Sequence, residues 1–203
     1  GNAALRGGGL HMHESDITVG GFSFQGNSAT EGAGAFLQNT DGVLQFPVFA
    51  EDVATDSGGA LLVDGGTPTL EGVTITGTEA AYGGALTVRN ATVTLDGGAI
   101  SYCISGADGG ALRLEMAGEV DADAVSFDSN TARGHGGVAS VVEGSTLTMT
   151  DCTSTLALSQ GGLGGGISCL AATVRLYGTD LTESRIMTSG FTQGSGSGLY
   201  ASG

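Results

Sequence analysis

Four acidic side chains recur at nearly the same place in a repeating pattern. Glu71, Asp96 and Asp123 are separated by 25 and 27 residues, and Asp121 lies two positions before the last of them. If these positions stack, neighbouring carboxylates lie roughly 5 Å apart. Like charges that close either raise one another's pKa or bind a cation. We therefore consider a divalent-cation site, with calcium as the cation, beside the alternative of a solvated acidic surface.

Two further groups of residues could carry chemistry. His11 and His13 flank Met12, so an extended strand would expose both, and such a pair binds zinc when a third ligand lies near. The alternative is two exposed histidines without a metal. Asn90-Ala91-Thr92 is an N-glycosylation sequon in a predicted turn. We expect a glycan on Asn90 if the source is a eukaryotic secretory cell.

A repeat of about 25 residues must position these side chains. Gly-Gly-Ala-Leu occurs at 58–61, 83–86 and 109–112, and related motifs of small residues end at Leu10, Phe36, Ala139, Ile167 and Leu199. A second column with this period contains Phe24, Phe49, Ile75, Ile100, Phe127, Cys152 and Leu181. A third contains Val19, Leu44, Leu70, Leu95, Ala122, Leu147 and Leu176. Three columns that keep one period indicate a true structural repeat.

Each repeat has three short stretches in which apolar and polar residues alternate, the period of a β-strand. Three strands and three corners make one coil of a parallel β-helix, right-handed because parallel crossovers nearly always are. We predict one all-β domain over residues 1–203, with coils of about 25–28 residues, seven of them full and another partial. The sequence begins and ends within a repeat. We therefore expect a segment of a longer chain, whose coil ends contact other chains.

The amino-acid composition of the chain disfavours some classes of binding partner. The chain has 39 glycines, 40% hydrophobic residues, no lysine and a net charge of −15. So acidic a surface repels nucleic acid and anionic lipid. No apolar run approaches the roughly 18 residues of a membrane span, so we expect no direct span. The three cysteines form no CxxC pattern.

The combination of Gly-Gly-Ala-Leu with Phe-x-x-Asn, as in Phe24 to Asn27 and Phe127 to Asn130, resembles the repeats of the chlamydial polymorphic outer-membrane proteins. This resemblance covers nearly the whole chain as a repeat pattern. It implies a β-helical, autotransporter-passenger-like surface protein that acts as an adhesin.

A second resemblance suggests catalysis. Gly134-His135-Gly136 looks like the Gly-His-Gly element of polygalacturonases, which are also right-handed β-helices. Glycoside hydrolysis needs two carboxylates, which the acidic residues at 71, 96 and 123 could supply. However, the glycines also belong to the corner motif of the repeat, and Arg133 is the only nearby cation that could hold an anionic sugar.

We therefore predict a non-catalytic, extracellular or cell-surface scaffold with a structural or adhesive role. The alternatives are a subunit of a polymeric surface appendage such as a flagellar hair, and a polysaccharide-active enzyme. The expected partners are other protein chains, copies of this chain, and host or cell-surface glycans. We expect contacts through coil ends, outward faces and the long corners 155–164 and 184–196.

Overall fold

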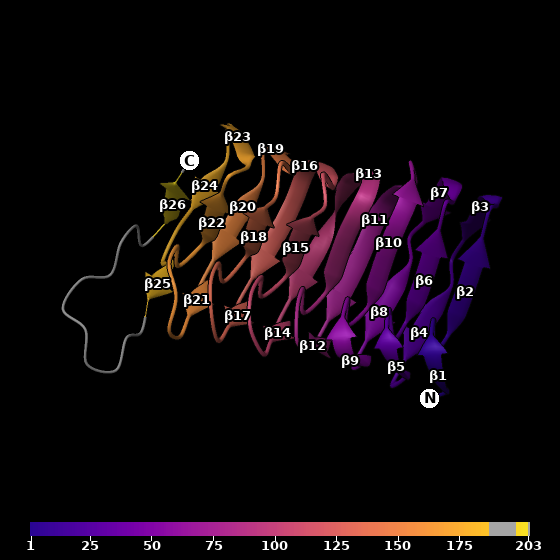
Figure 1. Ribbon diagram of the computed structural model, residues 1–203. Helices are drawn as coiled ribbons and strands as arrows, with labels where there is room; N and C mark the ends of the chain where they lie inside the picture. Colours follow the sequence, from indigo (N-terminus) through magenta and orange to yellow (C-terminus); the bar gives the residue numbers. More distant parts are fainter. Residues whose placement is uncertain (187–197, 203) are drawn as a thin grey trace.

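The chain winds into a parallel β-helix whose coils lie side by side from one end of the molecule to the other (Figure 1). The computed structural model describes residues 1–186 and 198–202, and within these ranges it contains β-strands and no helix. The strands of successive coils pair in parallel register throughout. The predicted all-β parallel β-helix of about seven coils is confirmed. No helix that could cross a membrane occurs in the described part.

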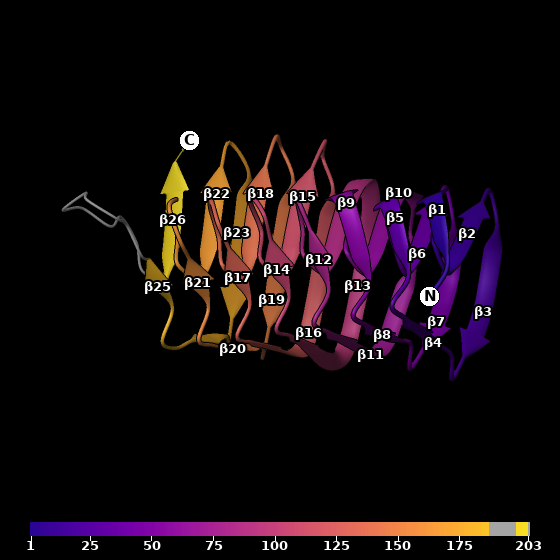
Figure 2. The same cartoon turned by 90° about the horizontal axis from the view of Figure 1, so that it is seen from below.

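Each coil contributes a strand to a first face (Figure 2). Side chains along each strand alternate between the interior and the outside. In chain order the strands of this face are β2 (Leu10–His13), β6 (Ala35–Gln38), β10 (Leu61–Gly66), the first part of β13 (Leu86–Ser101), β15 (Leu112–Glu115), β18 (Ala139–Val142), β22 (Ile167–Leu170) and β26 (Leu199–Ser202).

The second face bends once in every coil, so that it is built from one long strand or two short ones. Its strands are β3 (Asp16–Gly20), β4 (Ser23–Gln25), β7 (Asp41–Gln45), β8 (Val48–Ala50), β11 (Thr69–Thr76), the rest of β13, β16 (Glu119–Asp128), β19 (Thr146–Thr150), β20 (Thr153–Thr155), β23 (Thr173–Tyr177) and β24 (Asp180–Leu181).

The third face is an eight-stranded parallel sheet of short strands. These are β1 (Ala3–Arg6), β5 (Ser28–Glu31), β9 (Val53–Ser57), β12 (Glu79–Ala80), β14 (Ile104–Ser105), β17 (Thr131–Ala132), β21 (Leu158–Ser159) and β25 (Arg185–Ile186). The three faces enclose one continuous core of Leu, Val, Ile, Phe and Ala side chains.

The register corrects three positions of the predicted columns. Ala35, not Phe36, stacks between Leu10 and Leu61. In the sixth coil, Ser154 replaces Cys152 in the second column and Met149 replaces Leu147 in the third. In the sixth coil the shift is two residues, which keeps the side chain on the same side of the strand and cannot be detected from the alternating pattern. Phe36 lies only one residue from Ala35, so its side chain faces outward.

Sharp corners join the faces, and one of them carries glycine in each of the seven coils in which the structure describes it. This corner precedes the first face and is occupied by Gly7, Gly32, Gly58, Gly83, Gly109, Gly136 and Gly164, all with positive φ. A Cβ on Gly58 would lie 2.3 Å from the carbonyl oxygen of Leu61. Other corners with positive φ carry larger residues such as Glu51 and Tyr102, because their side chains point into open space.

A polar ladder lies inside the corner between the second and third faces. Asn27 donates hydrogen bonds from its backbone N and from Nδ2 to Oδ1 of Asp52, at 2.7 and 2.9 Å. Asp52 is fully buried, and its Oδ2 has no hydrogen-bond partner in the described part of the chain. Burial therefore raises the pKa of Asp52, although the hydrogen bonds from Asn27 oppose the shift.

Candidate functional site

The predicted acidic ladder forms on the second face. Glu71 of β11, Asp96 of β13 and Asp123 of β16 occupy neighbouring register positions, and Gln45 donates a hydrogen bond to Oε2 of Glu71 at 2.9 Å. Asp121 pairs with Thr94 in the adjacent column. Within the described residues, no group of three His, Cys, Asp or Glu side chains gathers closely enough to hold a metal ion. The calcium site stays a prediction.

The two histidines at the first coil are exposed, as predicted. Their neighbours in the next coil are Phe36 and Gln38. The ring of His11 packs edge-on against Phe36, with centroids 5.1 Å apart. His13 lies 3.6 Å from Glu14, and this pair alone does not make a three-ligand zinc site.

The sequon asparagine lies in an exposed corner. Asn90 has a φ of +48° at the end of the first-face part of β13, and its Nδ2 is 3.5 Å from Oδ1 of Asp64. The side chain is therefore accessible to a modifying enzyme. Glycosylation of Asn90 stays a prediction.

One column of outward side chains on the first face is largely buried between Phe36 and Ser168, although it lies outside the core. We call it the outer column, and it contains His11, Phe36, Leu62, Thr87, Arg113, Ser140, Ser168 and Tyr200. Phe36 and Leu62 are 1% and 0% exposed, yet neither belongs to the core. Side chains from the corner between the third and first faces cover the column, as Arg6 does when it stacks on Phe36.

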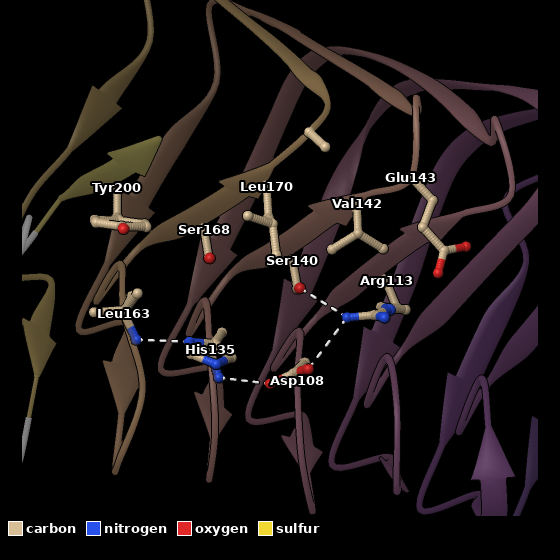
Figure 3. A pocket seen from close by; sticks show the side chains of 11 residues that line it. Asp108, Arg113, His135, Ser140, Val142, Glu143, Leu163, Ser168, Leu170 and Tyr200 are labelled. Carbon is tan, nitrogen blue, oxygen red and sulfur yellow. Dashed lines mark hydrogen bonds and ion pairs between the residues drawn. The ribbon is translucent and has the colours of Figure 1, made fainter. Parts of the chain in front are cut away.

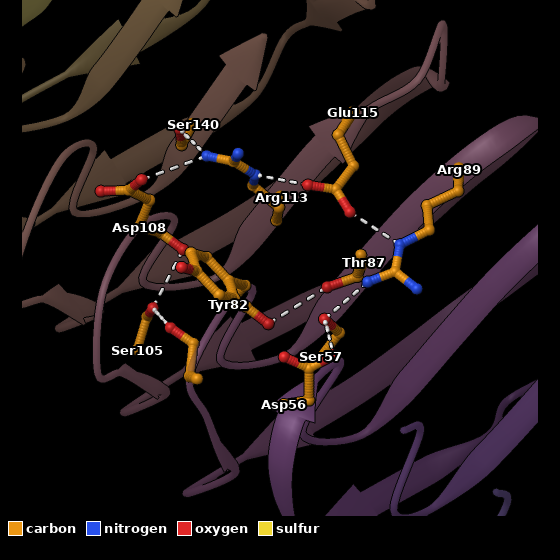
Figure 4. Close-up of polar contacts among 11 residues, drawn as sticks. Asp56, Ser57, Tyr82, Thr87, Arg89, Ser105, Asp108, Arg113, Glu115 and Ser140 are labelled. Atoms are coloured by element: carbon orange, nitrogen blue, oxygen red, sulfur yellow. Dashed lines mark hydrogen bonds and ion pairs between the residues drawn. The ribbon is translucent and has the colours of Figure 1, made fainter. Parts of the chain in front are cut away.

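Charged groups link the coils along this covered column (Figure 4). We call the linked groups the polar chain, which runs through Arg6, Glu31, Arg89, Glu115, Arg113 and Asp108, with neighbouring partners 2.7 to 3.2 Å apart. Asp108 then accepts a hydrogen bond from the backbone N of His135 at 2.8 Å. The chain thus joins side chains from successive coils along much of the helix.

Arg89 is central to the polar chain. Its Nε donates to Glu115, its Nη1 to Glu31 and its Nη2 to Ser57. Desolvation by itself lowers the pKa of Arg89, but the hydrogen bonds and charges of Glu115 and Glu31 outweigh it and raise the pKa. The guanidinium therefore stays charged and fully committed to protein partners.

A pocket opens where the outer column changes from large to small side chains (Figure 3). Ser140 and Ser168 are 2% and 7% exposed and form part of its lining, and the pocket has a volume of about 430 Å³. We call it the serine pocket. Its other lining residues are Asp108, Arg113, His135, Val142, Glu143, Leu163, Leu170, Ala171 and Tyr200. Pockets of about 300–1,000 Å³ with mixed polar and apolar lining are typical of small-molecule sites.

Hydrogen bonds fix the polar groups of the serine pocket. Nη1 of Arg113 donates to Oγ of Ser140 at 2.9 Å and to Oδ2 of Asp108 at 3.2 Å. Nδ1 of His135 accepts a hydrogen bond from the backbone N of Leu163 at 2.8 Å, so the neutral ring carries its proton on Nε2. These groups are held in place before any ligand arrives.

The structure does not bring the predicted catalytic residues together. His135 lines the serine pocket, whereas the acidic ladder lies on the second face and contributes nothing to that lining. Gly136 is required by the corner, because a Cβ there would collide with the carbonyl group of Ala139. The Gly-His-Gly resemblance therefore has a structural explanation, and the proposed hydrolytic constellation does not form around His135.

Sequence reasoning missed the residues that make the serine pocket. Arg113, Ser140, Ser168 and Tyr200 come from four coils, and only the exact register of the first face aligns them. The predicted contact corner 155–164 does contribute Leu163. The other predicted contact corner is 184–196, and its residues 187–196 lie outside the described residues.

The chain was compared with known protein families, proteins and structures. No protein-family model, curated protein or solved structure matches the chain.

Proposed function

We propose that this protein is a non-catalytic, extracellular or cell-surface scaffold with a structural and adhesive role. The observation that carries the proposal is the polar chain, whose charged groups, most of them partly buried, pair with one another and join side chains of different coils. An arginine in a catalytic or anion-binding site keeps donors free for its ligand. Each of the three nitrogens of Arg89 instead donates a hydrogen bond within the protein, to Glu115, Glu31 and Ser57.

Regular stacking supports the same role. Each coil adds roughly 4.8 Å to the length of the helix, so surface groups are displayed at fixed intervals along a rod. The stability of such a repeat comes from contacts between neighbouring coils. The acidic surface, with a net charge of −15, disfavours nucleic acid and anionic membranes as partners. Protein chains, copies of this chain and glycans are the proposed partners.

Labelling of cells tests the location. Antibodies against the folded chain are expected to label intact, unpermeabilised cells of the source organism, and protease added outside should remove the label. Labelling that requires permeabilisation would refute the proposal.

A shortened rod tests the scaffold role. Deletion of residues 136–163 joins His135 to Gly164, which occupies the same corner as Gly136, and so removes one coil while keeping every member of the polar chain. The shortened chain is expected to fold and to be shorter by about 5 Å, measured by small-angle scattering. A chain that no longer folds, or that loses no length, would show that the coils do not act as interchangeable spacers.

A further inference from the structure

The serine pocket lies over part of the outer column, at positions where other coils carry larger, buried side chains. In the second and third coils the outer column carries Phe36 and Leu62, and both are buried. In the sixth and seventh coils the same column carries Ser140 and Ser168. Two small side chains in succession leave unfilled the volume that phenyl and isobutyl groups occupy elsewhere. The cavity is thus produced by the choice of residues and not by a distortion of the fold.

The hydroxyl groups on the floor of the pocket are placed to meet a polar ligand. Oγ of Ser140 accepts from Arg113, so its own proton is available to a second group. Ser168 is 7% exposed and adds a second hydroxyl group to the lining. Nε2 of His135 adds a third donor. Oxygen atoms of a ligand can accept hydrogen bonds from these donors.

The charges around the pocket argue against an anionic ligand. Arg113 is its only arginine, and the ion pairs with Asp108 and Glu115 already neutralise that charge. Glu143 adds a further carboxylate at the exposed rim. A phosphate, sulfate or uronate would therefore meet a negative surrounding field. Among the described residues of the lining, Tyr200 is the single Phe, Tyr or Trp, whereas recognition of quaternary ammonium groups uses a cage of several.

The lining of the serine pocket also contains apolar side chains. Val142, Leu163 and Leu170 offer aliphatic surface beside the hydroxyl groups, and Tyr200 offers a ring at the far end of the outer column. An uncharged pyranose has this character, with C–H groups on its faces and hydroxyl groups around its edge. From these observations we infer that the serine pocket binds one uncharged pyranose unit of a glycan. The inference rests on the proposed adhesive function and names its ligand class.

Ligand-observed NMR on the purified chain tests the inference. The probes are the methyl glycosides of glucose, galactose, mannose and N-acetylglucosamine, with methyl glucuronide and N-acetylneuraminic acid as charged counterparts. At ordinary ligand efficiency, a ring of about twelve heavy atoms gives a Kd of about 1 mM. At least one neutral glycoside should bind in that range, and the charged sugars at least tenfold more weakly.

Two variants locate the binding. Ser168→Leu gives the seventh coil a leucine in the outer column, as the third coil has at Leu62. The variant should therefore fold and lose binding at least tenfold. Thr173→Leu changes an exposed residue of the same coil outside the pocket and should bind as the original chain does. Equal melting temperatures of the two variants show that both are folded.

Several results would overturn the inference: no neutral glycoside binds, a charged sugar binds better, or Ser168→Leu leaves binding unchanged. Because these measurements use the isolated chain, they are independent of the cell-labelling test. Surface labelling without sugar binding would reject the pocket alone. Sugar binding by a chain that is not at the surface would reject the scaffold proposal alone.

Discussion

Two glycines with nearly equal φ should respond very differently to alanine. Gly58 has a φ of +65° and Gly77 a φ of +63°, so the backbone penalty for an L-residue is the same at both, about 1–2 kcal/mol. They differ in the atoms that surround the new methyl group. A Cβ added at Gly77 would have no atom within 4 Å apart from those of its chain neighbours. A Cβ added at Gly58 would be 2.3 Å from the oxygen and 2.7 Å from the carbon of the Leu61 carbonyl.

Both close contacts at Gly58 are backbone atoms, so no side chain can move aside. Relief requires the corner to shift, and this disturbs the hydrogen bond from the Gly58 N to the Tyr82 oxygen and the bond from the Ala33 N to the Gly58 oxygen. At roughly 0.5–1.5 kcal/mol for each of the two hydrogen bonds, with the backbone penalty added, Gly58→Ala should lose about 2–5 kcal/mol. Gly77→Ala should lose about 1–2 kcal/mol.

Urea unfolding followed by circular dichroism measures the difference. If the slopes are equal, the midpoints report stability directly. A difference of about 2 kcal/mol corresponds to roughly 4–8 °C in melting temperature for a chain of this size. Equal losses at the two positions would refute the argument, because they would show that positive φ alone, and not the close approach to the Leu61 carbonyl, requires glycine at this corner.

Three other predictions concern buried polar groups. Asp52→Asn should raise the free energy of unfolding near pH 7 by about 1–3 kcal/mol, since it replaces a buried carboxylate oxygen that has no partner. Because burial raises the pKa of Asp52, the original chain gains stability as the pH falls through that pKa, and the advantage of the variant should vanish below about pH 4. Arg89→Met should lower the free energy of unfolding by about 1–2 kcal/mol, because Glu31 and Glu115 each lose one charged partner and keep another, Arg6 and Arg113. Burial raises the pKa of Cys103 to about 11, so a thiol reagent near pH 8 should not modify it in the folded chain.

Each of these has a control. Denaturant unfolding of Asp52→Asn at several pH values would contradict the prediction if its advantage grew in acid. Arg175→Met changes an exposed arginine and should shift stability by no more than about 0.5 kcal/mol; an equal loss at Arg89 would mean that the polar chain adds little. For Cys103, mass spectrometry should find the label only after unfolding in guanidinium chloride, and rapid native labelling would contradict its burial.

The repeat made much of the fold predictable. Inward columns such as Leu44, Leu70 and Leu95 keep their period because each coil must place an apolar side chain against the same neighbours. The acidic positions Glu71, Asp96 and Asp123 aligned correctly for the same reason, since they lie beside this column. Glycine before the first face was also predictable, because that corner has positive φ in every coil.

The sequence by itself could not determine register where the pattern is ambiguous. Phe36 is apolar like the core residues beside it, but the register turns its side chain outward under Arg6. Met149 and Leu147 both face inward, so the alternation does not say which of them belongs to the third column.

Only the tertiary structure revealed the groove over the first face and the serine pocket within it. The polar chain joins groups far apart in sequence, such as Glu31 and Arg89, because the corner side chains of several coils converge over one column. A serine looks the same in sequence whether it lies in solvent or on the floor of a cavity. What distinguishes Ser140 and Ser168 is the cover built above them by other coils, and that cover depends on the stacking of the whole helix.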